Sequence, residues 1–121
     1  MRARRLAVVG AGVAPVVALA GCSSSAVSAA GTWGTPSSQG KPYLELKTGG
    51  ALSGSDGCNR LTGTWTQSGD DVTFGHLAST LIACQGVDTW LSKAHSATIK
   101  GSTMRVLDDD KQDIGTLTKS N

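Results

Sequence analysis

The chain has 121 residues, of which 39% are hydrophobic, 17% charged and 4% aromatic, and it contains 16 glycines. This length excludes a multidomain enzyme, and the composition is too apolar for a disordered chain and too rich in glycine for a helical bundle. Three of the eleven basic residues lie within the first 21 positions, which leaves eight bases against nine acids, and this net charge of −1 argues against a nucleic-acid-binding protein.

The N-terminus is typical of a bacterial lipoprotein signal. Residues 1–5 are mostly basic, and residues 6–21 form an apolar run of 16 that ends in Leu-Ala-Gly directly before Cys22. Because a membrane span needs about 20 apolar residues, we interpret residues 1–21 as a cleaved signal peptide rather than an anchor helix. The Leu-Ala-Gly-Cys end resembles a lipobox. Cys22 is therefore predicted to carry acyl chains, palmitate among them, that hold the protein on a membrane outside the cytoplasm.

The two other cysteines are expected to form a disulfide. Acylation of Cys22 leaves Cys58 and Cys84, and two free cysteines outside the cytoplasm pair. The bond would close a loop of about 27 residues, which the chain-entropy relation values at about 3.5 kcal/mol. A zinc site formed by both cysteines and His76 is the alternative, but CxxC or HxxxH spacing and a fourth ligand are missing.

After the cysteine, the chain is expected to form a tether and then a series of short strands. Residues 22–31 are rich in serine and alanine, which predicts a tether ahead of one domain over residues 32–118. In that domain, alternating apolar residues are separated by turns that contain Gly or Asp. The expected strands cover residues 43–47, 51–55, 61–67, 72–74, 76–81, 97–100, 103–107 and 113–118.

One segment has helical rather than strand periodicity. Within residues 86–96, Val87, Trp90, Leu91 and Ala94 follow the i, i+3, i+4, i+7 spacing of an amphipathic helix. The fold class predicted from these elements is mainly β, a small antiparallel barrel of about eight strands with one α-helix near residues 86–96. A barrel of eight strands is just wide enough to be filled by its own side chains.

Two ordered motifs resemble the META/HslJ family. The first is the run Ser53–Arg60, which contains Gly-Cys-Asn-Arg, and the second is the run Ser79–Cys84, which follows Phe74-Gly75. The resemblance spans about residues 32–118. It implies a conical, eight-stranded antiparallel barrel with a helix. It also implies an association with bacterial envelope lipoproteins, heat-shock-linked and antibiotic-tolerance proteins, and it implies no established enzymatic activity.

The first motif supplies the candidate interaction loop, which consists of Asp56, Gly57, Asn59 and Arg60. Glycine at 57 permits a positive φ beside a bridged cysteine, and the amide of Asn59 is suited to capping a turn. Arg60 is suited to binding backbone carbonyls or a carboxylate. A structural role for this loop is favoured over direct ligand contacts, because Gly/Asn turns are common.

No catalytic residue, metal site or cofactor is expected. His76 and His95 are the two histidines, and no G-x-S-x-G run accompanies them, so a hydrolase triad is not favoured. The acidic run 108–110 with Asp113 lacks the alternating ligands, glycine and distal glutamate of an EF-hand, and we interpret it as a solvated turn. Trp33, Trp65 and Trp90 are expected in the core rather than on a binding face, because the domain has few other aromatic residues.

The sequence therefore predicts a lipid-anchored extracytoplasmic protein with a non-enzymatic binding or scaffolding role at the cell envelope, during stress or antibiotic exposure. Its expected partners are the membrane, through the lipid on Cys22, and an unidentified envelope protein, while the chain itself is expected to be a monomer. Two alternatives stay open. One is a barrel that carries a small apolar ligand, and the other is an inhibitor that presents Asp56–Arg60 to an envelope hydrolase.

Overall fold

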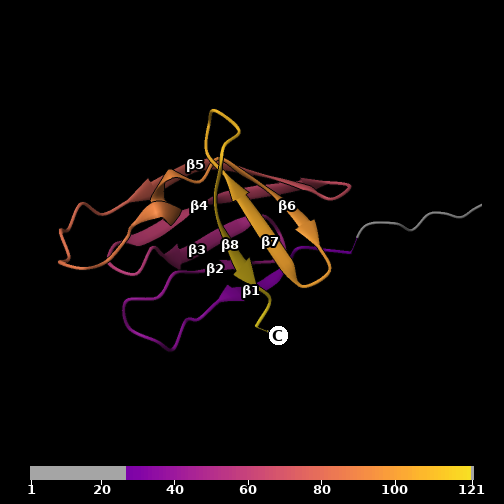
Figure 1. Cartoon of the computed structure of the whole chain (residues 1–121). Helices are drawn as coiled ribbons and strands as arrows, with labels where there is room; N and C mark the ends of the chain where they lie inside the picture. The colour runs from indigo at the N-terminus through magenta and orange to yellow at the C-terminus, as the bar shows by residue number, and fades with distance from the viewer. Residues whose placement is uncertain (1–26, 121) are drawn as a thin grey trace, which may run out of the picture.

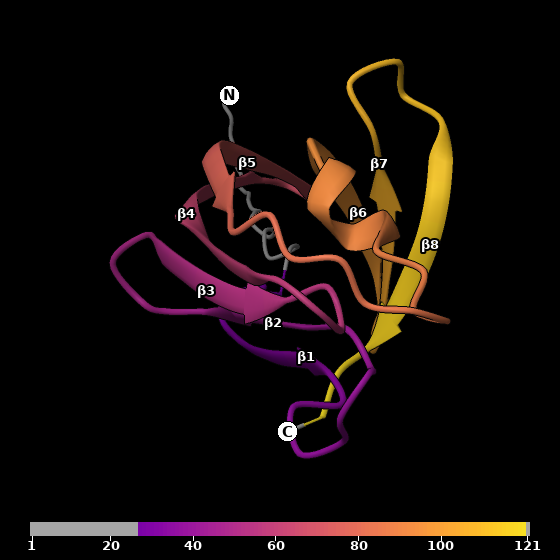
Figure 2. The same ribbon diagram turned by 90° about the vertical axis from the view of Figure 1, so that its left-hand side faces the viewer.

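The computed structural model describes residues 27–120, which form eight antiparallel strands joined in chain order and rolled into a nearly closed barrel (Figures 1 and 2). The predicted mainly-β barrel is thereby confirmed. The predicted signal peptide, Cys22 and residues 23–26 lie outside the described residues. The strands are β1 (Gly31–Gly34), β2 (Tyr43–Leu46), β3 (Ala51–Ser55), β4 (Arg60–Ser68), β5 (Asp71–Ser79), β6 (Ser96–Lys100), β7 (Thr103–Leu107) and β8 (Asp113–Thr118).

The first and last strands meet at a seam. Trp33 of β1 forms an isolated antiparallel bridge with Lys119, and the backbone N–H of Ser120 donates to Thr32 O at 2.9 Å. The ammonium group of Lys119 lies 5.2 Å from the centre of the Trp33 ring and donates to Ala30 O at 3.1 Å. The seam therefore combines backbone pairing with a cation–π contact.

Strand alternation places one set of apolar side chains inside the barrel. Trp33 is fully buried there, while Trp65 and Trp90 are partly buried and pack against the same core. Ala29 is also buried, and its N–H donates to Gln67 Oε1 at 2.8 Å, so the end of the predicted tether packs on the barrel. The remaining buried apolar residues are Leu44, Leu46, Leu52, Leu61, Val72, Phe74, Leu91, Ala94, Ala97, Ile99, Met104, Val106 and Leu117.

The predicted α-helix over residues 86–96 is wrong, because the segment forms only one 3₁₀ helix, Trp90–Lys93. Ala94 is already extended, and the backbone of His95 is bonded to two strands: its N–H donates to Leu107 O at 2.8 Å, and its carbonyl accepts from Phe74 N at 3.0 Å. Because the sheet takes up the chain from His95 onward, too few residues remain before it for an α-helix to offset its cost of nucleation. The apolar stripe is nevertheless used, since Leu91 and Ala94 are buried.

A bulge changes the phase of β5 halfway along its length. Thr62 pairs with Ala78 and Thr64 with Gly75, so two residues of β5, 76 and 77, oppose the single residue Gly63. His76 takes a positive φ of 49° there and is exposed. The bulge lets both Phe74 and Leu77 contact the core, although a regular strand would place them on opposite faces.

The two ends of the barrel differ in what they carry. The first described residue, Val27, lies at the barrel end that carries the β4–β5 turn, and its carbonyl accepts from Gln67 Nε2 at 2.8 Å. Strand β5 then runs away from that turn, and nine residues span about 30 Å. Residues 80–84, which follow β5, therefore lie at the opposite end from Val27 (Figure 1). We call this opposite end the distal rim.

Candidate functional site

The motif loop at the distal rim is built around the side chain of Asp56, which is fully buried. Its Oδ1 accepts from the backbone N–H groups of Cys58 at 2.9 Å and Asn59 at 2.5 Å, and its own N–H donates to Asn59 O at 3.1 Å. These bonds close a tight Asx turn between β3 and β4. Oδ2 of Asp56 is buried and has no hydrogen-bond partner among residues 27–120.

Close approach explains the glycine that follows. Gly57 has a φ of 102°, and a Cβ atom at this position would lie 2.8 Å from Gly40 O and 3.1 Å from Val87 Cγ1. Its N–H donates to Ser55 Oγ at 3.0 Å. A larger residue would therefore strain the backbone and separate the loop from its two neighbouring segments.

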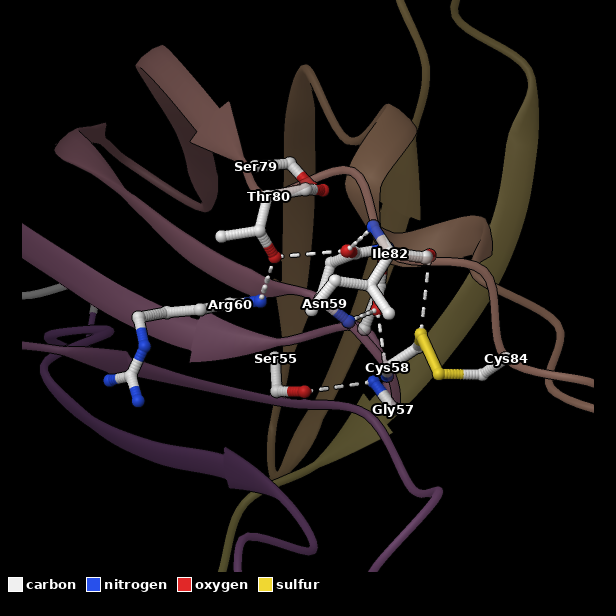
Figure 3. The surroundings of a disulfide bond; sticks show 10 residues. Ser55, Gly57, Cys58, Asn59, Arg60, Ser79, Thr80, Ile82 and Cys84 are labelled. Carbon is white, nitrogen blue, oxygen red and sulfur yellow. Dashed lines mark hydrogen bonds between the residues drawn. A yellow bond between two sulfur atoms is a disulfide. The ribbon is translucent and has the colours of Figure 1, made fainter.

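Asn59 connects the motif loop to the segment after β5 (Figure 3). Its Oδ1 accepts from Ile82 N at 2.5 Å and from the Thr80 hydroxyl at 2.9 Å, and its Nδ2 donates to Ile82 O at 3.1 Å. The side-chain amide thus makes the paired bonds that a neighbouring strand residue would make. It is 7% exposed, so these bonds are largely shielded from water.

A disulfide fixes the same segment a second time. Cys58 and Cys84 are bonded, with their Cα atoms 5.9 Å apart, and Cys58 Sγ lies 3.3 Å from Ile82 O. The predicted pairing is confirmed. Residues 80–84 are therefore held at both ends, by Asn59 and by the disulfide, although they belong to no strand.

The guanidinium group of Arg60 points away from this cluster (Figure 3). The backbone of Arg60 pairs with Thr80: its N–H donates to Thr80 Oγ1 at 3.1 Å, and its carbonyl accepts from Thr80 N at 3.2 Å. Arg60 is exposed, and within residues 27–120 its side chain has neither an ion pair nor a hydrogen bond. The first residue of β4 therefore presents a positive charge that is unpaired within residues 27–120.

Two exposed apolar side chains complete the distal rim. Leu81 is 97% exposed and Ile82 is 59% exposed, and the backbone bonds of Ile82 to Asn59 keep this pair from folding back onto the core. The strand expected over residues 76–81 included Leu81 but not Ile82, and exposure was predicted for neither residue. The signal that was available is the lack of any charged residue between Phe74 and Asp88.

Both histidines line one surface pocket of about 490 Å³, together with Phe74, Lys93 and Asp108 among others. In the described part of the chain, neither imidazole is hydrogen-bonded to an acidic side chain. The hydroxyl of Ser92 in this pocket donates to Thr89 O at 2.9 Å rather than to a histidine. The geometry therefore does not assemble a nucleophile, base and orienting acid.

The acidic run forms the β7–β8 turn. Oxygens of Asp108, Asp109 and Asp110 lie within 4.8 Å of one another. Asp108 Oδ1, however, accepts from the backbone N–H groups of Asp110 and Gln112, both at 2.9 Å, so it serves the turn. Asp113 pairs with Arg105 at 3.3 Å instead of joining the three. A divalent cation would have only the carboxylates of one loop here, and those of Asp109 and Asp110 are exposed.

The fold and this rim define the class of protein: a small all-β barrel whose motif loop is joined by a disulfide to the segment after β5. The model of the META domain matches residues 23–121, and the chain belongs to that family. The resemblance in the two sequence motifs is thereby confirmed. Comparisons with curated proteins and with solved structures give no match. Over residues 27–120, no helix has the length and apolar character needed to span a membrane.

Proposed function

We propose that this chain is a lipid-anchored protein of the bacterial cell envelope that binds another envelope protein and catalyses no reaction. Membership of the META domain family supports a non-catalytic, envelope-associated domain. The signal-like residues 1–21 and the lipobox ending in Cys22 support export and acylation. The Cys58–Cys84 disulfide fits an oxidising compartment outside the cytoplasm. A role during envelope stress follows only from the sequence resemblance.

The single observation that carries the binding role is the placement of the distal rim. The described chain begins beside the β4–β5 turn, whereas Arg60, Leu81 and Ile82 are exposed at or near the other end of the barrel. Only four residues lie between Cys22 and Val27 at the described start, and a span of five positions reaches at most about 20 Å. An anchored barrel would therefore keep its turn end near the lipid and present the distal rim to the envelope space.

The same rim also suits an inhibitor of an envelope hydrolase, because hydrogen bonds hold the loop from Asp56 to Arg60 and its arginine has no partner among residues 27–120. Such inhibition would be a particular form of partner binding. A carrier barrel is less well supported, because the interior is filled by buried side chains such as Trp33, Leu44 and Met104.

Fractionation of cells that produce Cys22→Ser tests the anchor. We expect the unchanged chain in the membrane fraction, with an intact mass that includes acyl chains, and the Cys22→Ser chain outside that fraction. Ser23→Ala, which keeps the cysteine, is the matched control and is expected to stay with the membrane. A Cys22→Ser chain that remains membrane-bound would show that the lipid anchor is wrong.

Native mass spectrometry of the acylated protein, released in mild detergent, tests the binding role. A protein partner that is retained by the unchanged chain and lost on Arg60→Ala supports the rim as the binding surface. A retained small molecule in place of a protein would instead support the carrier barrel and contradict the proposal.

A further inference from the structure

Within residues 27–120, strand β5 has a free edge over its second half. Strand β6 pairs only with Asp71–Thr73, and the last backbone bond on that side is from Phe74 N to His95 O. Beyond the bulge at His76, the rest of β5 pairs with β4 alone among the described residues. A free strand edge presents unpaired N–H and C=O groups that are ready to bond with another chain.

Asn59 lengthens this edge past the end of the strand. In the antiparallel ladder, Thr80 bonds to Arg60, and the next residue on the same side, Ile82, bonds to the Asn59 amide. Alternation then turns the backbone groups of Leu77, Ser79 and Leu81 away from β4. In the part of the chain that the structure describes, the N–H and C=O of Leu81 have no hydrogen-bond partner.

The charged and proline residues that usually protect a free edge are missing from residues 77–83, and the protective device present is the β-bulge at residues 76 and 77, where this edge begins. Natural edges carry lysine, proline or inward-pointing charges, whereas this stretch reads Leu-Ala-Ser-Thr-Leu-Ile-Ala. Its end is also apolar and exposed, with Leu81 at 97% and Ile82 at 59%. The bulge at His76 limits the edge on one side, and the disulfide at Cys84 limits it on the other.

The surroundings of the edge favour a peptide strand over a second copy of this chain. Arg60 pairs with Thr80 from β4, one strand in from the free edge, and lines a surface pocket together with Ser79 and Thr80. Within residues 27–120 its guanidinium is unpaired. The edge itself carries no acid that a second copy would bring to this cation. Antiparallel pairing of two β5 edges would also direct the two starting ends, each at Val27, in opposite directions, which does not suit two copies anchored on one membrane.

We propose that residues 77–83 accept one extended strand of a partner protein, apolar at alternate positions and carrying a carboxylate where it passes Arg60. Backbone bonds to Ser79 and Leu81 would supply affinity, and contacts with the leucines and with Arg60 would supply selectivity, as in other cases of strand addition. This inference rests on the proposed binding function and names the chemistry of its partner.

The test uses the full chain, purified from its own cells, and a fluorescein-labelled heptapeptide, Thr-Val-Glu-Val-Thr-Val-Thr, as the probe. Binding is followed by fluorescence anisotropy up to millimolar protein. Two further probes carry N-methyl groups on the odd-numbered or on the even-numbered amides. Because only every second amide of an added strand bonds to the edge, we expect one methylated probe to lose binding and the other to keep it.

Two protein variants separate the backbone from the side chain. Leu81→Pro removes an outward N–H and leaves the bonds to β4 intact, whereas Leu81→Ala keeps that N–H. Since one hydrogen bond is worth about a factor of ten, we expect Leu81→Pro to bind the probe about tenfold more weakly than Leu81→Ala. Near-ultraviolet circular dichroism checks that both variants are folded.

Charge recognition is tested with a probe in which glutamine replaces the glutamate. The unchanged chain is expected to prefer the glutamate probe, and Arg60→Ala is expected to bind both probes equally. Lys100→Ala, which removes an exposed charge from β6, is the control and is expected to keep the preference.

Several results would overturn the inference. These are no binding at millimolar protein, equal binding of both methylated probes, or equal binding by Leu81→Pro and Leu81→Ala. Protection of residues 77–83 from hydrogen exchange that rises with protein concentration in the absence of any peptide would assign the edge to a second copy. Failure here with a partner still retained in native mass spectrometry would leave the proposed function standing.

Discussion

At the scale of single residues, Asn59 performs a task that is normally performed by a strand. Its amide offers one acceptor and one donor to Ile82, and its Oδ1 also accepts from the Thr80 hydroxyl. An aliphatic residue at position 59 would leave the partly buried N–H and C=O groups of Ile82 without partners. An unsatisfied polar group of this kind costs more free energy than a satisfied hydrogen bond contributes to stability. The residue thus determines where the chain runs after β5.

Asn59→Asp is expected to lower the free energy of unfolding by about 1–3 kcal/mol. The carboxylate still accepts from Ile82 N, but it has no donor for Ile82 O and places negative charge beside that carbonyl. Urea denaturation monitored by tryptophan fluorescence measures the change. Gln85→Glu, the same chemical change at an exposed neighbouring position, is the control and is expected to alter stability by less than about 0.5 kcal/mol. Equal stability of both variants would show that the Nδ2 bond contributes nothing.

The sequence was sufficient to identify the motif loop and the disulfide, because both follow from residue types and from cysteine parity. It was not sufficient to place Leu81 and Ile82. Two apolar residues in an extended run are normally assigned to a core, and their exposure here depends on bonds to Asn59, which lies over twenty positions earlier. That the Arg60 side chain has no partner within the described residues is likewise a result of packing, which residue type alone does not reveal.

At the scale of elements, the β4–β5 hairpin was predicted in outline and its bulge was not. The expected strands at 72–74 and 76–81 are a single strand, β5, that bends at His76. In the sequence, such a bend is visible only as a break in the alternation of apolar and polar residues. The helix prediction failed for a related reason, because the spacing of Leu91 and Ala94 suits one helical turn as well as three, and the backbone bonds of His95 decide the length.

Gly63→Ala is expected to destabilise this hairpin. A Cβ atom at residue 63 would lie 2.8 Å from Gly75 O and 3.2 Å from His76 O, so the two strands would have to separate at the bulge. We expect a loss of about 1–3 kcal/mol in the free energy of unfolding, together with faster hydrogen exchange in β5. Thr62→Ala, an exposed change one pleat away, serves as the control. Unchanged exchange in β5 would mean that the bulge tolerates a side chain opposite it.

At the scale of the whole molecule, closure of the barrel joins the two ends of the described chain. Trp33 and Lys119 are paired across the seam, and Trp90 packs against Gly115 of β8, where a Cβ atom would lie 2.6 Å from its ring. The seam therefore lies between the N-terminal end of the chain, where the proposed anchor begins, and the last strand.

Lys119→Met tests how much of that closure comes from the charge. Methionine keeps an apolar stem against Trp33 but removes the ammonium group that lies 5.2 Å from the ring centre and bonds Ala30 O. We expect the free energy of unfolding to fall by about 1 kcal/mol, the sum of a modest cation–π contact and one half-exposed hydrogen bond. Exchange of the β1 amides should quicken more than exchange in β4. Lys100→Met, which replaces an exposed lysine of β6, is the control. If Lys100→Met lowers the free energy of unfolding as much as Lys119→Met does, the Lys119 ammonium group contributes nothing specific and backbone pairing alone holds the seam.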